Sequence, residues 1–408
     1  MGMGKDYTIT FIYEKFFLGG AETLIYRMSK WLVEKKYDVE IVFREIDEEL
    51  KKICIESKIN LVPIKKFTAS NYYKATKAKN NQQLIVTFFV VDFILAEQIK
   101  KKSQKDVKTI LYVVHPYILI NKYFSKNKVG IIFKSAMKKL VLKMYNSKSV
   151  YFMDEDCINV CSDYYKINLK KAYNEIIRLP MYLRYYRKKK KNPGQLKVLS
   201  ISRIDFPFKG YLLGLIDAIE KLNDNNIKLT IIGDGPDRSI LEKKIEKSTM
   251  KHNINYVGAV PYNRLDSHFK NSDLYIGMGT TVLDAVSAGT PAICVYSYTL
   301  NFKVTGFFYE APHVLGGIKE GETYPCLDGV YFLEKVNLMN DCQYQALIDK
   351  GNEVLKKIYN IDLVMPAFLK NVLDGKNKNN KLLAPTFILW GLRKIQRLHF
   401  FKIKRQNK

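Results

Sequence analysis

The sequence predicts an α/β protein made of two doubly wound domains, each a parallel sheet with helices on both faces. Three observations predict this fold. Short apolar runs typical of buried strands alternate with segments of helical periodicity. The 408 residues are enough for two domains with separate cores. A basic run at 187–191 followed by Pro193 and Gly194 breaks the pattern near the middle and indicates a boundary.

The first half, residues 1–185, begins with a strand, a helix and a second strand. The helix has apolar residues at positions 24, 25, 28, 31 and 32, which form one face. The acidic residues 154–156 follow a predicted strand, and we interpret them as a solvated turn. The expected elements of this half are strands at 7–13, 39–43, 84–91, 109–114, 151–153 and 159–160, with the helix at 21–34.

The second half starts a fresh alternation after the basic linker at 186–196. It is expected to run from 197 to 375 and to be followed by a basic, aromatic tail at 376–408. Ligands of such sheets bind outside the carboxyl ends of the strands, so the loops there are the informative ones. The expected elements are strands at 197–200, 228–232, 254–257 and 274–276, and helices at 211–222, 238–247, 262–270 and 282–288.

The segment 273–293 contains a tight turn, Gly277–Gly279, between a strand and a helix. Asp284 is expected in the first turn of that helix, where the dipole favours a carboxylate that can bind the vicinal diol of a ribose. The segment resembles the nucleotide-binding signature of retaining glycosyltransferases with the GT-B fold, bacterial surface-polysaccharide enzymes of family 4 type. In that signature a Glu, seven residues and a second Glu frame a Gly-x-Gly turn. Asp284 falls on the second Glu, and Ile276 falls on the first.

A second loop, residues 200–210, leaves a strand and enters a helix at Gly210. Its Arg203 and Lys209 are expected to bind a diphosphate without a metal ion, because two cations and a helix N-terminus would balance the charge. The loop resembles the family's Gly-Arg-Leu-x-x-x-Lys-Gly motif and is one residue longer. The resemblance implies that Arg203 and Lys209 stabilise the leaving nucleoside diphosphate. The alternative is a pair of solvated loop charges.

Further loops match the family's donor site. The resemblance implies that Gly235 and Val257 lie near the nucleobase; ordinary βα turns are the alternative. Gly19 and Gly20 resemble the family's Gly-Gly loop, and a plain turn is their alternative. His115 ends a strand where related enzymes place a His near the transferred sugar, and it could instead be a loop residue without a ligand. The donor set is completed by Gly277, Met278, Gly279, Thr280, Thr281 and Asp284.

The charge of the chain favours anionic partners. Lys and Arg number 67 against 40 Asp and Glu, a formal net charge of +27. Nucleic acid ranks below a membrane and phosphorylated small molecules, because no nucleic-acid-binding motif is present. The six cysteines lack the spacing of disulfide frameworks or metal sites, which indicates a reducing cytosol. We expect no secretory signal and no spanning helix, since the longest apolar runs, 84–91 and 382–392, are too short.

Two segments are candidates for membrane contact. Residues 131–145 form an amphipathic helix with lysines on one face, whose apolar face could alternatively pack on the first sheet. Residues 382–408 combine aromatic and basic side chains, which suits a lipid interface.

The resemblance implies transfer of a sugar, with retention, from a nucleotide diphosphate donor, expected to be a UDP-sugar, to a lipid-linked or other saccharide acceptor. The enzyme would be a cytoplasmic protein on the inner face of the cell membrane, with no cofactor and no nucleic-acid partner. A catalytically silent GT-B partner of an active transferase is the alternative, because Ile276 replaces the first Glu. Sugar-nucleotide epimerisation is a third possibility, and it would require more acidic and His groups.

Overall fold

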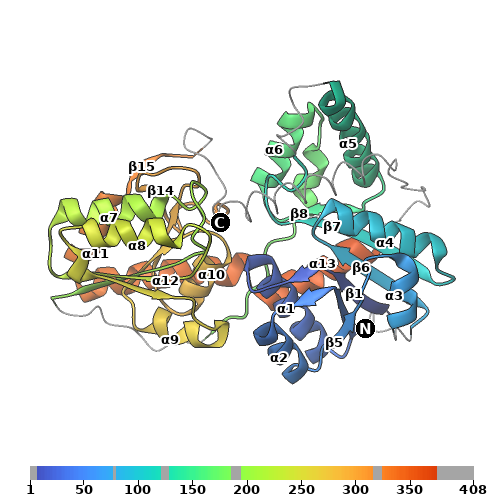
Figure 1. The fold of residues 1–408 in the computed structure, drawn as a ribbon, viewed down its shortest axis with the longest axis horizontal. Coiled ribbons are helices and arrows are strands. Elements are labelled where there is room, and N and C mark those ends of the chain that lie inside the picture. The colour runs from blue at the N-terminus through green and yellow to red at the C-terminus, as the bar shows by residue number, and fades with distance from the viewer. Residues whose placement is uncertain (1–6, 77–79, 121–127, 185–193, 316–323, 375–408) are drawn as a thin grey trace. The chain divides into compact units, whose positions relative to one another are not determined.

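The computed structural model describes residues 7–76, 80–120, 128–184, 194–315 and 324–374. These residues form two compact units (Figure 1). Among the described residues, the first unit comprises 7–180 and 361–374, and the second comprises 181–360. Each unit has one large sheet with helices on both faces, which confirms the predicted fold class.

The first unit has a six-stranded parallel sheet in the order β5-β3-β1-β6-β7-β8. Its strands are β1 (Tyr7–Ile12), β3 (Asp38–Phe43), β5 (Asn60–Pro63), β6 (Gln82–Thr87), β7 (Asp106–Val113) and β8 (Val150–Phe152). Its helices are α1 (Gly20–Glu34), α2 (Glu48–Glu56), α3 (Ala69–Ala75), α4 (Val90–Lys102), α5 (Lys128–Asn146), α6 (Glu155–Tyr165) and α13 (Ile361–Asp374). Two short strands, β2 (Lys15–Phe16) and β4 (Glu45–Ile46), pair separately.

Alternating residues of the strands build the core of this unit. Ile12, Val42 and Ile85 belong to one buried cluster with residues of α3 and α4. Because neighbouring strand residues point to opposite faces, Phe11 and Ile41 face the other way, and both are fully buried. Burial of both faces explains why the strands are nearly continuous apolar runs.

The structure corrects three predictions in the first unit. The apolar run 84–91 is not one strand, since β6 ends at Thr87 and α4 begins at Val90. The predicted strand at 159–160 lies within α6. Asp154 caps this helix by accepting a hydrogen bond of 2.7 Å from the Cys157 amide. The acidic residues 154–156 are therefore a helix start, and Asp154 is buried rather than solvated.

The second unit has a seven-stranded sheet in the order β11-β10-β9-β12-β13-β14-β15, with the last two strands antiparallel. Its strands are β9 (Leu196–Ile201), β10 (Ile227–Ile232), β11 (Ile254–Gly258), β12 (Leu274–Gly277), β13 (Ala292–Val295), β14 (Lys303–Phe307) and β15 (Leu327–Asp328). Its helices are α7 (Tyr211–Leu222), α8 (Arg238–Lys247), α9 (Leu265–Lys270), α10 (Thr280–Ser287), α11 (Gly329–Leu338) and α12 (Asp341–Ile358). Helices α7, α8 and α11 cover one face, and α9, α10 and α12 cover the other (Figure 1).

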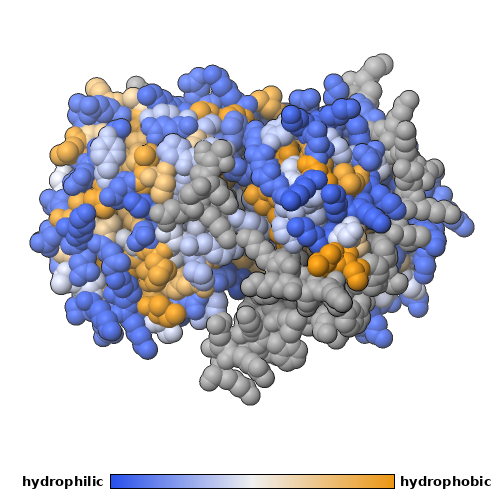
Figure 2. Space-filling model, turned by 90° about the horizontal axis from the view of Figure 1, so that it is seen from above, coloured by the Kyte–Doolittle hydropathy of each residue, from blue (hydrophilic) through white to orange (hydrophobic). Residues whose placement is uncertain are grey.

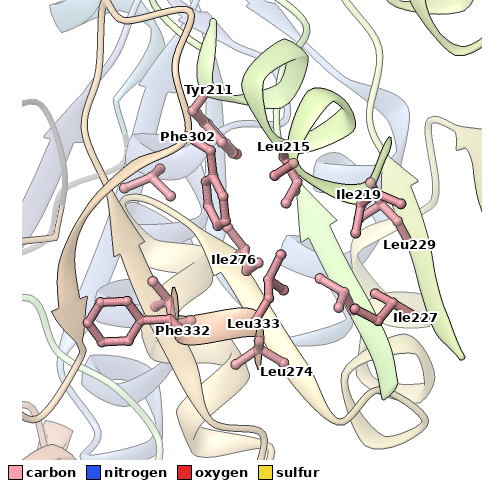
Figure 3. Packing of buried hydrophobic residues seen from close by; sticks show 14 of the residues in the cluster. Tyr211, Leu215, Ile219, Ile227, Leu229, Leu274, Ile276, Phe302, Phe332 and Leu333 are labelled. Carbon is pink, nitrogen blue, oxygen red and sulfur yellow. The ribbon is translucent and has the colours of Figure 1, made fainter. Parts of the chain in front are cut away.

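Ile276 belongs to the core of the second unit. It is fully buried in β12 and lies in the same cluster as Leu274, Phe302 and Leu333 (Figure 3). Position 276 therefore fills the interior between the sheet and its helices. A carboxylate there would be desolvated.

The unit boundary differs from the predicted one at both crossings. Helix α13, assigned from sequence to the second domain, packs on the first unit, where Phe368 contacts the ring of Tyr112. The Trp31 indole also donates a 2.9 Å hydrogen bond to Asp362. Met181, assigned to the first domain, hydrogen-bonds through its amide to the Tyr359 carbonyl of the second unit. Residues 186–193 of the predicted linker (186–196) and the whole predicted tail (376–408) lie outside the described residues.

The surface drawn in Figure 2 is mostly hydrophilic, with hydrophobic residues in small separate groups. Within 131–145, the apolar side chains of Phe133, Met137, Leu140, Val141 and Met144 are buried in the first unit. That face therefore packs on the protein, and among the large apolar side chains of the segment only Ile131 and Ile132 are exposed. Among the described helices, none combines the length and the apolar character needed to cross a membrane.

Candidate functional site

The switch point of the second sheet gathers most of the predicted donor-binding residues. From β9 the chain adds β10 and β11 on one side, and it then crosses to add β12 and β13 on the other. The loops after β9 and β12 consequently diverge at the carboxyl edge, which is where doubly wound sheets bind ligands. Arg203 and Lys209 lie in the loop after β9. The segment Gly277–Asp284 covers the end of β12, the turn that follows it and the first five residues of α10.

The loop after β9 carries two cations in different surroundings. Arg203 is exposed, and its Nε lies 3.8 Å from the Asp205 carboxylate. The half-buried Lys209 places its ammonium 4.6 Å from the centroid of the Phe208 ring. Burial lowers the pKa of Lys209 to about 7, and the Asp205 charge opposes part of this shift. The loop can therefore present one permanent charge and one that depends on pH.

The start of α7 differs from the expected anion site. The Gly210 amide donates to the Pro207 carbonyl at 3.0 Å, and the Leu212 and Leu213 amides donate to the carbonyls three residues before them. A Cβ at Gly210 would lie 2.5 Å from the Thr299 carbonyl oxygen, so glycine is required there by the adjacent backbone. The cations of the loop, more than the helix amides, are what a diphosphate would meet.

The glycines after β10 serve the packing of two loops. A Cβ on Gly235 would lie 2.1 Å from the Ile204 carbonyl oxygen. The two loops are also joined by the Ile204 amide, which donates to the Asp234 carbonyl at 3.0 Å, and by the Phe206 amide, which donates to the Asp237 carboxylate at 2.6 Å. From the sequence, Gly235 is predicted to lie near the nucleobase of the donor. In the structure it allows the close approach of the loop that contains Ile204. The predicted base neighbour Val257 is exposed in β11.

Tyr275 connects the end of β9 with the start of α10 through hydrogen bonds. Its hydroxyl lies 2.6 Å from the Thr281 hydroxyl and donates at 3.1 Å to the Ile201 carbonyl at the end of β9. A Cβ on Gly277 would meet this phenol at 2.4 Å, which explains the glycine. The sequence analysis did not single out Tyr275, because a strand tyrosine gives no signal beyond burial. The Thr281 hydroxyl also donates to the Met278 carbonyl at 3.1 Å, so it is engaged within the protein.

At the start of α10, one backbone amide that could bind a ligand is already hydrogen-bonded within the protein. Gly279 has a φ of 74°, a conformation that favours glycine, and its amide donates to the Leu315 carbonyl. Met278 is buried in the core of the unit. Thr280, the first residue of the helix, is half-buried. Of the predicted turn residues, Thr280 is thus the one whose placement at a helix N-terminus best matches the expected role.

Asp284 lies deeper than expected. It is the fifth residue of α10, so it lies in the second turn of the helix. The prediction that it lies in the first turn is wrong, because α10 begins at Thr280, two residues before the predicted start at 282. Asp284 is 5 % exposed. Burial is the main cause that raises the pKa of Tyr275, and the charge of Asp284 adds a small part.

The first unit has its own switch point, between β1 and β6. Gly19 and Gly20 follow β1, and Gly19 is the N-cap of α1 in an extended conformation. His115 follows β7, and its Nδ1 accepts a 3.2 Å hydrogen bond from the Tyr117 amide. Nδ1 therefore lacks a proton, and Nε2 carries one in this neutral tautomer. The structure thus places the Gly-Gly loop and His115 at the carboxyl edge, as predicted.

No cluster of three or more His, Cys, Asp or Glu side chains within the described ranges could hold a metal ion.

Comparison with known proteins finds similarity over part of the chain. Residues 184–305 match the model of the family described as "Glycosyl transferases group 1". The alpha-monoglucosyldiacylglycerol synthase of Streptococcus pneumoniae is 25% identical over 136 residues, 30% of this chain and 30% of that protein. The protein of the same description from Acholeplasma laidlawii is 26% identical over 159 residues, 32% of this chain and 39% of that one. The matches thus span about a third of these relatives.

Solved structures extend the likeness to the whole fold. HepE of Anabaena, determined with UDP, superposes with a TM-score of 0.62 at 11% identity, covering 90% of this chain and 100% of that chain. At this identity the likeness shows the fold, which is the two-domain GT-B architecture.

Proposed function

We propose that the protein transfers a sugar from a nucleoside diphosphate donor to a saccharide acceptor, on the premise that residues 184–305 match the family model described as "Glycosyl transferases group 1". The observation that carries the proposal is the loop after β9, where Arg203 and Lys209 lie at the switch point of the second sheet. A departing diphosphate develops negative charge, and fixed cations stabilise it without a metal ion.

The donor is proposed to be a UDP-sugar. The neighbouring HepE structure contains UDP, and the cations Arg203 and Lys209 of this chain suit the diphosphate of such a donor. Stereochemical retention follows the motif resemblance at Asp284 and the loop with Arg203. The chain's own contribution is to hold the diphosphate and the ribose, and no protein nucleophile is required.

The acceptor is proposed to be a lipid-linked saccharide at an anionic membrane surface on the cytoplasmic side. Two curated relatives are named as glycolipid synthases. Helix α5 has five lysines and no acidic residue, and Ile131 and Ile132 are exposed beside this charge. Exposed aliphatic residues flanked by lysines favour an anionic lipid interface. Assembly of a bacterial surface polysaccharide would use this arrangement.

A silent binding partner is the second candidate. Ile276 lies in the core, and the Gly279 amide is bonded to Leu315, so the usual acidic ligand of the donor sugar is missing from this turn. A screen of UDP-glucose, UDP-galactose and UDP-N-acetylglucosamine for UDP release separates the candidates. Turnover that is lost in Arg203→Ala supports the transferase. UDP binding by calorimetry without turnover of any donor supports the silent partner.

A further inference from the structure

Asp92 is a buried carboxylate without a hydrogen-bond donor among the described residues. It is the third residue of α4 and is 3 % exposed, and the start of its helix has no side-chain cap. Other buried carboxylates of the first unit are satisfied. Glu40 accepts hydrogen bonds from Thr10, Tyr72 and Thr76, and Asp154 accepts one from the Cys157 amide. Asp92 therefore differs from Glu40 and Asp154, because no described residue donates a hydrogen bond to its carboxylate.

Burial makes this carboxylate costly. It raises the pKa of Asp92 well above its usual range, and the charge of Glu14 adds to the shift. Arg44 does not compensate, because its guanidinium pairs with Glu14 and Glu45. Tyr13 does not compensate either, since its hydroxyl bonds to Glu22. Buried polar groups normally have partners, and an exception is a candidate for a functional role.

The position of Asp92 identifies that role. It follows β6 at the switch point of the first sheet, and Gly19 and Gly20 follow the neighbouring strand β1. The carboxylate oxygens are not among the fully enclosed, unpaired atoms of the described side chains. They therefore keep some contact with solvent at the edge where this fold binds ligands.

An exposed aromatic ring shares a neighbour, Tyr13, with this carboxylate. Phe89, the N-cap of α4, is 39 % exposed, and its ring centroid is 5.4 Å from that of Tyr13. The charge of Asp92 in turn acts on the Tyr13 phenol. An aromatic face accommodates the C–H face of a sugar ring, and a carboxylate accepts hydrogen bonds from sugar hydroxyls.

We propose that Asp92 and Phe89 form the subsite for the acceptor sugar, in which Asp92 accepts hydrogen bonds from its hydroxyl groups. This rests on the proposed function, because it assigns the acceptor to the first unit. The bound sugar supplies the donors that the protein lacks. Asp92 is thus an acceptor-binding residue, and specificity follows from the hydroxyls it contacts.

The first test measures thermal stability, which does not require an identified substrate. Asp92→Asn is expected to raise the Tm at pH 8, because it removes an unpaired buried charge. The gain should shrink toward pH 4: the folded-state pKa is raised, so the carboxyl destabilises the protein only above the pKa of the unfolded chain, about 3.9. Glu40→Gln is the matched control and should lower the Tm. A lower Tm for Asp92→Asn at pH 8 would show a structural role and overturn the proposal.

The second test measures binding in the full chain, with octyl glucoside as the probe and saturation-transfer NMR in the presence of UDP. Wild-type protein is expected to bind the probe, and Asp92→Asn and Phe89→Ala to lose at least tenfold in affinity. Equal binding by Asp92→Asn, or no binding by the wild type, overturns the subsite. UDP affinity by calorimetry is expected to be unchanged in both variants. Failure of the wild type to bind UDP would instead count against the proposed function, and the stability comparison would still decide on Asp92.

Discussion

The ammonium group of Lys209 lies over the ring of Phe208, 4.6 Å from its centroid, in the loop that we propose holds the diphosphate. Burial in this place lowers the pKa of Lys209 to about 7 in the ligand-free protein. Near neutral pH a substantial fraction of the side chain is therefore uncharged. A bound diphosphate adds two or more negative charges and reverses the shift.

We predict that UDP binding takes up a proton at pH 8. The bound state has the higher Lys209 pKa, so it binds more protons than the free state, and affinity should fall as the pH rises above 7. Calorimetry in two buffers with different ionisation enthalpies measures the uptake. Lys209→Arg is the control: it stays charged and should bind UDP without the proton. Equal proton uptake by both proteins would assign the effect to another group.

Arg203→Ala is expected to remove a charge-assisted hydrogen bond to the leaving diphosphate. Such a bond contributes about 1.5–3 kcal/mol, so the transfer rate should fall at least about tenfold. The measurement is initial rate at saturating donor. Lys244→Ala, which removes a surface cation of α8 paired with Asp217, should leave the rate unchanged. Near wild-type turnover in Arg203→Ala would contradict the diphosphate assignment.

Asp284→Asn is expected to weaken UDP binding, because an amide has one acceptor oxygen where the carboxylate has two. Calorimetry measures the affinity, and circular dichroism with heating checks the fold. The side chain is 5 % exposed, so a purely structural role predicts a different pattern. A lower Tm with unchanged affinity would place the ribose elsewhere.

Ile276→Glu should not restore the acidic residue of the family signature. The side chain would enter the core of the second unit, and burying it should cost at least about 3 kcal/mol. We expect the Tm to drop by about 6 °C or more without any gain in donor hydrolysis. The control is Ile240→Glu, since Ile240 is exposed on α8. A stable, more active Ile276→Glu variant would show that the turn can open.

The double variant Ile131→Ser and Ile132→Ser is expected to reduce co-sedimentation with phosphatidylglycerol vesicles, because both side chains are exposed at the start of a lysine-rich helix. Ile55→Ser alters a comparably exposed residue on α2 and should have no effect. High salt should weaken wild-type binding, since charges are screened over about 8 Å at physiological ionic strength. Deletion of residues 382–408 measures the share of the tail. Unchanged binding in both altered proteins would exclude these two surfaces.

Local periodicity predicted the second unit well. Helices α7 and α8 have the predicted bounds, and the strands agree within two residues, because glycine turns and caps separate clear apolar runs. The strand predicted at 159–160 is wrong, because a short segment of an amphipathic helix has the same local pattern as a short strand. Placing α13 requires the Tyr112–Phe368 contact, which no local pattern reveals.

The sequence predicts where the candidate site residues lie in the fold, but it does not predict which groups they contact. Arg203, Lys209 and His115 lie at carboxyl edges because the alternation of elements fixes where each strand ends. Counting residues from a signature put Ile276 in the sugar pocket, although the strand continues through it. Asp92 was missed because a carboxylate in a first helical turn is normal at a surface. Only the structure shows that it is buried without a donor.

Helix α13 makes the first unit discontinuous in sequence, with some 180 residues of the second unit between its parts. During synthesis, the surface that carries Tyr112 and Trp31 is made long before Phe368 and Asp362 leave the ribosome. The core of the first unit is therefore covered by α13 only after the whole second unit has been translated. A fragment ending at residue 180 should expose this surface and aggregate, whereas one that extends to residue 374 should not.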